Sequence, residues 1–123
     1  MNPEDNAKPG EELEQLFAED VPRFAIGQLV RHRRYGYRGV IVDFDVTCHA
    51  DEQWYQSNQT QPDRNQPWYH VLVHGATHTT YAAQDSLEAD PAGTPVDHPL
   101  VVHFFEGFDR GRYIRNDRPW PAE

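Results

Sequence analysis

The chain has 123 residues, which is enough for one domain, and a formal net charge of −9. This acidity argues against a protein that binds DNA tightly and without sequence preference, because such binding depends on neutralising phosphates. Only 37% of the residues are hydrophobic, but 12% are aromatic. Aromatic side chains bury about 150–250 Å² each, so a small core built largely from rings is expected.

The cysteine content, the apolar runs and the amino terminus together indicate where the protein is located. Cys48 is the single cysteine, so the chain cannot form an internal disulfide. No apolar run approaches the roughly 20 residues that span a bilayer. The amino terminus lacks the basic and apolar regions of a secretion signal. We therefore expect a cytoplasmic protein that does not enter a membrane.

The acidity is concentrated at the start of the chain. Residues 1–20 carry seven acidic residues against Lys8, a net charge of −6, whereas the rest of the chain carries thirteen acids and ten arginines, a net charge of −3. This predicts a flexible acidic leader over residues 1–22 and a folded domain over residues 23–123. A short helix is predicted at 11–18, and the leader is either a solvated tail or a docking segment for a partner.

From Phe24 onward, apolar residues recur with period two, which is typical of strands. Residues 28–32 and 39–45 are predicted to form a hairpin around a turn that holds Gly36 and Gly39, both read as turn residues that permit positive φ. The second strand is predicted to bury one face, made of Val40, Val42, Phe44 and Val46, with Ile41, Asp43 and Asp45 on the other face.

A long polar loop over residues 48–67 follows, and Trp54 is expected to anchor it to the core. Residues 68–74 are the clearest central strand, because they are rich in aromatic and β-branched side chains. The chain is predicted to return as a strand at 78–83 and to make a brief helical turn at 84–88.

The C-terminal part is predicted to hold one helix over residues 98–107, with Pro99 in its first turn and Gly107 at its end. A last short strand is expected at 112–116. The rings of Phe104, Phe105 and Phe108 should cap the open end of the sheet. Short strands, two tight hairpins and no alternating strand–helix units predict an all-β fold with minor helix: a small, strongly bent antiparallel (SH3-like) β-barrel with a short C-terminal helix.

The predicted hairpin turn concentrates positive charge in this acidic protein. It contains four of the eleven basic residues, beside two tyrosines: Arg31, Arg33, Arg34, Tyr35, Tyr37 and Arg38. Guanidinium groups bind phosphate oxygens in pairs, and a tyrosine ring can stack on an exposed base. Two interpretations stay open: a contact surface for DNA or an acidic protein, or a solvated hairpin whose arginines pair with local acids such as Asp43 and Asp45.

Four blocks in order carry a resemblance to a known family: Phe24-x-Ile-Gly-Gln-x-Val-x-His32, Tyr35-Gly-Tyr-x-Gly-Val-Ile41, Gln66-Pro-Trp-Tyr-His-Val-Leu-Val73 and Tyr81-Ala-Ala-Gln84-x-x-Leu87. The chain resembles the hemimethylated-DNA-binding (YccV-like) family over roughly residues 23–115. That family includes bacterial heat-shock protein Q and the carboxy-terminal domain of a eukaryotic F-box protein. The segment 98–105 together with Tyr113 is most similar to the F-box-protein version.

The resemblance implies a small β-barrel without catalytic activity. It also implies one of two roles, binding DNA that is methylated on one strand or acting as an adaptor or specificity factor for an ATP-dependent protease or chaperone. For DNA, the residues that the resemblance carries over are those of the turn, Arg31, Arg33, Arg34, Tyr35, Tyr37 and Arg38.

Other side chains with reactive chemistry form no convincing site. The spacing of Cys48, His49, His74 and His78 fits no common zinc motif, so we expect no metal and no cofactor. Cys48 and His49 are sequence neighbours without an orienting third group, which speaks against a thiolate catalyst. The sequence thus predicts a non-enzymatic protein and leaves its oligomeric state open.

The aromatic run at Trp68, Tyr69 and His70 invites comparison with an aromatic cage. Consecutive residues of a strand point to opposite faces, however, so the three side chains cannot line one pocket. We expect Trp68 to pack in the core with His70 hydrogen-bonded beside it. Tyr81 is expected opposite them, also in the core.

Overall fold

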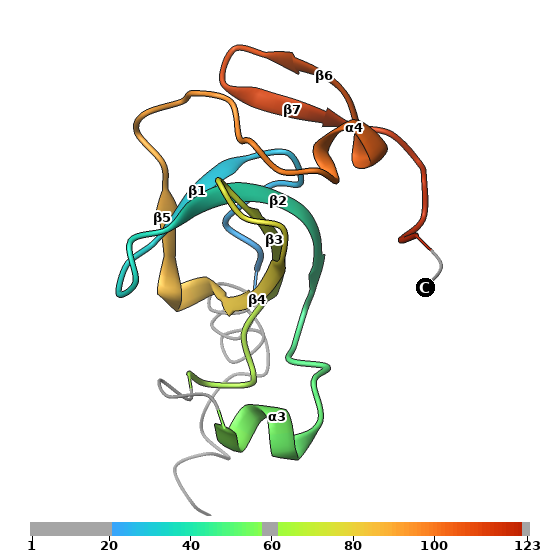
Figure 1. Ribbon diagram of the computed structural model, residues 1–123. Helices are drawn as coiled ribbons and strands as arrows, with labels where there is room; N and C mark the ends of the chain where they lie inside the picture. The colour runs from blue at the N-terminus through green and yellow to red at the C-terminus, as the bar shows by residue number, and fades with distance from the viewer. Residues whose placement is uncertain (1–20, 58–61, 122–123) are drawn as a thin grey trace, which may run out of the picture.

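The computed structural model describes residues 21–57 and 62–121 (Figure 1). These residues form a five-stranded antiparallel sheet of order β4-β3-β2-β1-β5 and a two-stranded sheet, β6-β7. The strands are β1 Leu29–His32, β2 Arg38–Asp45, β3 Trp68–Val73, β4 Thr79–Ala83, β5 Leu87–Ala89, β6 Phe105–Asp109 and β7 Arg112–Arg115. The helices are α3 Glu52–Ser57, α4 Val101–Phe104 and the 3-10 turn η1 Gln84–Ser86.

The larger sheet is strongly bent. Its two edge strands, β4 and β5, are joined directly by the three residues of η1, so the edges have to approach each other. Figure 1 shows the sheet curling, with β2 arching over β3 and β4. The predicted fold class, all-β with minor helix and a strongly bent antiparallel sheet, is confirmed.

The inside of the bend is the first core. All five strands of the sheet contribute to it, through Val30, Ile41, Tyr69, Val71, Ala82 and Leu87. Short strands can bury so much because each contributes one side of its alternation to the same enclosed space. This cluster is what requires the sheet to curl.

A second core covers the outer face of β1, β2 and β3. The C-terminal elements α4, β6 and β7 pack there, and the cluster comprises Leu29, Val40, Val42, Leu72, Val96, Phe104, Phe105 and Tyr113. The prediction that the second strand buries one face is therefore wrong. Val40, Ile41 and Val42 are all fully buried, because β2 is the middle layer between two cores.

The alternation in β2 is also interrupted. The pairing of β2 with β3 shifts between Ile41 and Asp43, which makes a β-bulge at Val42. A bulge inserts one residue and so reverses which face the later residues occupy. Phe44 accordingly packs with the inner cluster of Ile41, and Val46 is 58% exposed rather than buried with Val42.

Two further predictions are corrected at the local level. The helix expected over 98–107 is only the single turn α4, and the chain continues as β6 because Gly111 (φ +76°) allows it to turn back into β7. The helical turn expected at 84–88 ends at Ser86, and Leu87 begins β5. Phe104 and Phe105 are buried as expected, whereas Phe108 is 37% exposed.

Gly36 and Gly39 differ in their roles. Gly36 has φ +76° in the turn between β1 and β2, as predicted. Gly39 lies inside β2 with ordinary strand geometry, so its assignment to the turn is wrong. A Cβ at Gly39 would collide with the Leu72 carbonyl and lie 2.6 Å from a methyl of Val71, so close approach of β3 requires the glycine.

The last predictions concern the two ends of the chain and membrane-spanning segments. The last strand, expected at 112–116, is observed as β7. Almost all of the predicted leader, including the helix at 11–18, lies outside the described residues. In the part of the chain that the structure describes, no helix is long and apolar enough to cross a membrane.

Candidate functional site

The turn between β1 and β2 (residues 33–37, hereafter the cationic turn) is held in shape by His32. The Nδ1 atom of His32 accepts hydrogen bonds from the backbone N–H groups of Arg34 (3.2 Å) and Tyr35 (3.0 Å). The backbone carbonyl of His32 accepts a third hydrogen bond, from the N–H of Gly36 (2.9 Å). Burial of the ring, and secondarily the nearby charge of Arg34, lower the pKa of His32 below its usual 6.5. The ring is therefore neutral at pH 7 and can act as the acceptor.

Two of the four arginines are paired with carboxylates on the far edge of the sheet. Arg31 lies 3.2 Å from Glu88 in an exposed pair. The Nε atom of Arg38 donates to Asp90 at 2.7 Å, and its other nitrogens donate to the carbonyls of Thr94 and Pro95. The expected partners Asp43 and Asp45 take no part in these pairs, because β1 lies between β2 and β5 and brings the 88–90 segment alongside instead.

Arg38 thus serves the fold. Burial acts to raise the pKa of Asp90, but the hydrogen bond and charge of Arg38 outweigh it and hold that pKa below its usual range. The guanidinium ties the loop after β5 to the beginning of β2. Few of its donors remain for a ligand.

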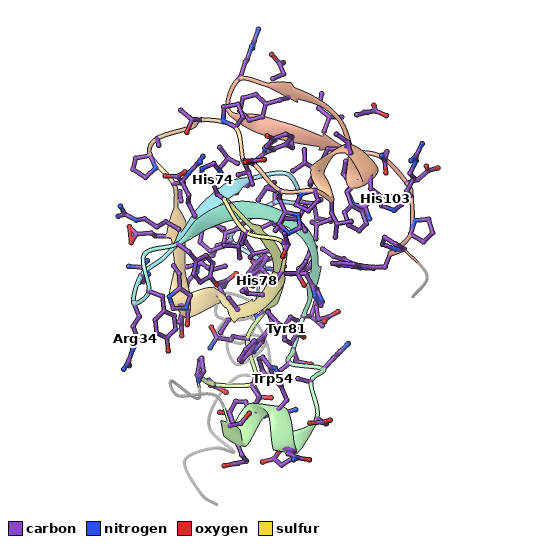
Figure 2. All side chains as sticks on the ribbon, viewed as in Figure 1. Arg34, Trp54, His74, His78, Tyr81 and His103 are labelled. Atoms are coloured by element: carbon purple, nitrogen blue, oxygen red, sulfur yellow. The ribbon has the colours of Figure 1, made fainter. Side chains whose placement is uncertain are left out.

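Arg33 and Arg34 present the free positive charge of the turn. Both residues are exposed, and within the described residues neither forms an ion pair with a carboxylate. Arg33 donates through Nε to the Leu87 carbonyl (3.2 Å), which fixes the base of its guanidinium. Arg34 lies 5.8 Å from the ring centroid of Tyr35, and Figure 2 shows it projecting outward from the tip of the turn.

The two tyrosines of the turn have separate roles. Tyr35 is 52% exposed and stacks on His32, with ring centroids 4.6 Å apart and planes at 23°. Tyr37 is half-buried and shares a hydrogen bond of 2.9 Å with the Thr80 hydroxyl. Burial raises the pKa of Tyr37, so it remains a neutral phenol at pH 7. One tyrosine faces solvent, and the other fastens the turn to β4.

Beside the turn lies a cleft of about 380 Å³, between the cationic turn, the edge strand β4 and helix α3. Its walls hold seven aromatic rings: His32, Tyr35, Tyr37, Trp54, Trp68, His70 and Tyr81. We refer to this space as the aromatic cleft. Figure 2 shows Tyr81 and Trp54 close together on neighbouring elements, and their centroids are 5.7 Å apart.

The alternation argument for β3 is confirmed. Trp68 and His70 line the aromatic cleft, while Tyr69 points to the opposite side and is fully buried in the inner core. Trp68 is also fully buried, and Trp54 packs edge-on against it at 6.0 Å, which anchors α3 as expected. Tyr81 is only half-buried, so it forms part of the cleft wall as well as of the core.

The partly exposed carboxylate of Asp45 fixes the far wall of the cleft. The hydroxyl of Tyr81 donates to Asp45 at 2.7 Å, and Nε2 of His70 lies 3.4 Å from the same oxygen. Burial, and secondarily the hydrogen bond to Asp45, raise the pKa of Tyr81 far above its usual 10. These contacts hold the rings of His70 and Tyr81 together, with centroids 4.5 Å apart.

Sequence reasoning located the cationic turn but not the aromatic cleft or the role of His32. The cleft residues come from four main segments, the β1–β2 turn, α3, β3 and β4, which meet only after the sheet has curled. His32 carried a signal in its position, immediately before a glycine-containing turn, but only the geometry shows which hydrogen bonds its ring accepts. Of the cysteine and histidines weighed as metal ligands, Cys48 is buried, and the described residues contain no group of three or more potential ligands.

With this geometry in place, the chain can be compared with known proteins. Residues 22–112 match the model of the family described as "Hemimethylated DNA-binding protein YccV like". The chain belongs to this YccV-like family. It is also 34% identical over 96 residues to F-box only protein 21 of Homo sapiens, Pongo abelii and Mus musculus. The resemblance to the F-box-protein version of the family is confirmed.

The YccV-like match covers the whole five-stranded sheet, α4, β6 and the first residue of β7. Both the cationic turn and the aromatic cleft fall inside it. The aligned region is 76% of this chain but 15% of each F-box only protein 21. This YccV-like chain therefore spans only a small part of the length of those relatives.

Proposed function

We propose that this YccV-like domain binds DNA through the cationic turn and its flanking residues 31–38. One observation carries the proposal: Arg33 and Arg34 are exposed and free of carboxylate partners within the described residues, on a turn that neighbouring hydrogen bonds hold in shape. Membership of a family named for hemimethylated DNA supports the choice of DNA as the ligand.

The four arginines should contribute unequally. Arg33 and Arg34 are available to phosphates and can bind them in pairs of hydrogen bonds. Arg31 is engaged only in a solvent-exposed ion pair with Glu88, which is worth little and can be exchanged for a phosphate contact. Arg38 is committed to Asp90 and acts indirectly by supporting the turn.

The test is a salt titration of binding to a labelled duplex of about 20 base pairs, between about 50 and 200 mM salt. DNA binding predicts a log–log slope of about −0.9 per phosphate contacted, so Arg33→Gln with Arg34→Gln should reduce the slope by about 2. Arg112→Gln with Arg118→Gln is the matched control, because it removes two exposed arginines outside the turn. If both double variants reduced the salt slope by the same amount, a specific role for the turn would be contradicted.

Preference for hemimethylated DNA is the finer proposal. The same duplex should be compared in unmethylated, hemimethylated and fully methylated form. We expect the hemimethylated form to bind most tightly at a fixed salt concentration. Equal affinity for all three would leave DNA binding standing and remove the methylation preference.

The net charge of −9 favours one alternative, a cytoplasmic adaptor or specificity factor for an ATP-dependent protease or chaperone with no direct DNA binding. Affinity purification from native lysate, with and without nuclease, separates the two. A protease or chaperone retained after nuclease treatment, together with no salt-dependent DNA binding, would favour the adaptor.

A further inference from the structure

The aromatic cleft is a neutral cavity beside a cationic surface. Its lining residues include no carboxylate, no lysine and no arginine. The nearby Asp45 already accepts a hydrogen bond from Tyr81 and contacts His70. A cationic ligand such as a methylated lysine would therefore find rings but no free counter-charge, and Arg33 and Arg34 would repel it. A neutral ring attached to an anionic chain fits both surfaces.

The cleft offers ring surface to a planar ligand. Tyr35 remains 52% exposed although it stacks on His32. Trp54 is 37% exposed on the α3 side of the cleft. Stacking between an aromatic side chain and a nucleobase tolerates any sequence, because every base presents a π-face.

The β4 wall adds polar groups of defined position. Thr79 and Thr80 both line the cleft, and the hydroxyl of Thr80 is oriented by its hydrogen bond with Tyr37. Such hydroxyls can pair with the edge of a base that stacks on the neighbouring rings. The volume of about 380 Å³ lies within the range of about 300–1,000 Å³ that is typical of small-molecule pockets.

We propose that the aromatic cleft binds one unpaired or extruded nucleobase of DNA, with Tyr35 and Trp54 as its stacking surfaces. Arg33 and Arg34, at the neighbouring turn, then bind the flanking phosphates. A base inside a duplex cannot reach such a cleft, so it must be unpaired or rotated out of the stack. The inference rests on the proposed DNA binding and adds to it a separate site for the base.

The test compares two labelled duplexes of about 20 base pairs with equal phosphate numbers, one carrying a single bulged thymine and the other an abasic residue at that position. The full chain should bind the thymine bulge about 10-fold more tightly, in line with the stacking contribution of one base. Tyr35→Ala should abolish this preference and leave the salt slope unchanged. Phe108→Ala is the control for Tyr35→Ala, because it also removes an exposed aromatic ring, but one that lies on β6 outside the cleft.

Tryptophan fluorescence gives a second, independent measurement. Thymine-bulge DNA should quench the emission of the wild type more than that of Trp54→Phe, because Trp54 is the exposed tryptophan of the cleft. The quenching remains informative if Tyr35→Ala fails to fold, which circular dichroism would reveal.

The outcomes separate the two proposals. Equal affinity for both duplexes, with the salt dependence retained, would overturn the base site and leave DNA binding intact. No salt-dependent binding of either duplex would overturn both. Quenching of Trp54 by a trimethyl-lysine peptide but not by the bulged DNA would overturn the base site in favour of a protein ligand.

Discussion

At the scale of single residues, His32 is the side chain on which the cationic turn depends. Its neutral ring accepts two backbone N–H groups and also stacks on Tyr35. Protonation at Nδ1 would remove the acceptor and place a positive charge beside Arg34. The shape of the turn is therefore linked to the charge state of one imidazole.

This linkage has a definite sign. The folded pKa of His32 is below 6.5, so as the pH falls through about 6.5 the unfolded chain takes up a proton before the folded one does. The stability that the neutral His32 ring contributes is fully present above pH about 6.5, the pKa of the unfolded chain, and is lost as the pH falls below it. His32→Asn keeps an oxygen acceptor and cannot titrate, so its melting temperature should fall less than that of the wild type between about pH 7 and pH 5. Identical pH profiles of the two proteins would contradict this role.

Arg38 illustrates how an arginine can belong to a binding hairpin and yet serve stability. Arg38→Met would leave the carboxylate of Asp90, whose side chain is 5% exposed, without its partner. We expect a loss of about 3 kcal/mol in the free energy of unfolding, measured by urea denaturation. Combining Arg38→Met with Asp90→Asn should recover part of this loss. If Arg38→Met lowered the free energy of unfolding no more than Arg34→Gln does, the ion pair of Arg38 with Asp90 would not contribute to stability.

At the scale of elements, β2 is the strand that organises the molecule. It lies between β1 and β3 in the sheet and between two cores in depth. The carbonyl of its bulged residue, Val42, accepts a hydrogen bond from Arg115 of β7 (3.2 Å), whose guanidinium also lies 4.7 Å from the ring centroid of Phe104. The bulge thus connects the five-stranded sheet to the C-terminal hairpin.

The two glycines of the β1–β2 hairpin test how tightly β2 packs against its neighbour β3. Gly36→Ala should cost about 1 kcal/mol, because the left-handed backbone is strained but the space around it is open. Gly39→Ala should cost about 3 kcal/mol, since its Cβ would collide with the backbone of β3. Urea denaturation of both variants measures the difference. Equal losses would mean that β3 can move away from Gly39 without penalty.

At the scale of the whole molecule, the net charge of −9 opposes DNA binding, and most of the negative charge lies at the start of the chain. The first 20 residues alone carry a net charge of −6. They join the described domain at Val21, whose carbonyl accepts a hydrogen bond from the side chain of Gln84, the first residue of η1. The Ser86 carbonyl at the end of η1 in turn accepts a hydrogen bond from the N–H of Arg33, so Val21, to which the acidic segment is attached, is connected to the cationic turn through η1.

Deletion of residues 1–20 should therefore strengthen DNA binding, because it removes a net charge of −6 that repels phosphates. The gain should be several-fold at about 50 mM salt and should shrink at about 200 mM, as screening shortens electrostatic reach to about 8 Å or less. We propose that residues 23–123 fold independently, so the melting temperature should change little. Unchanged affinity at both salt concentrations would show that the segment does not influence the surface.

Much of the fold followed from local patterns. The period-two alternation and the aromatic, β-branched run at 68–73 located β1 to β4, and the cluster of arginines located the turn. These features depend only on neighbours in the chain, because a strand alternates its side chains and a glycine permits positive φ wherever it occurs.

What the sequence could not provide is which distant segments meet. The acids that pair with Arg31 and Arg38 lie some 50 positions away, at Glu88 and Asp90, because β5 pairs with β1. The second core over β2, the bulge at Val42 and the aromatic cleft arise from the same cause, the curling of the sheet and the packing of the C-terminal hairpin on it. Local sequence determined strands β1 to β4 and the positive charge of the turn, and long-range packing decided which of those charges and rings remain free to bind.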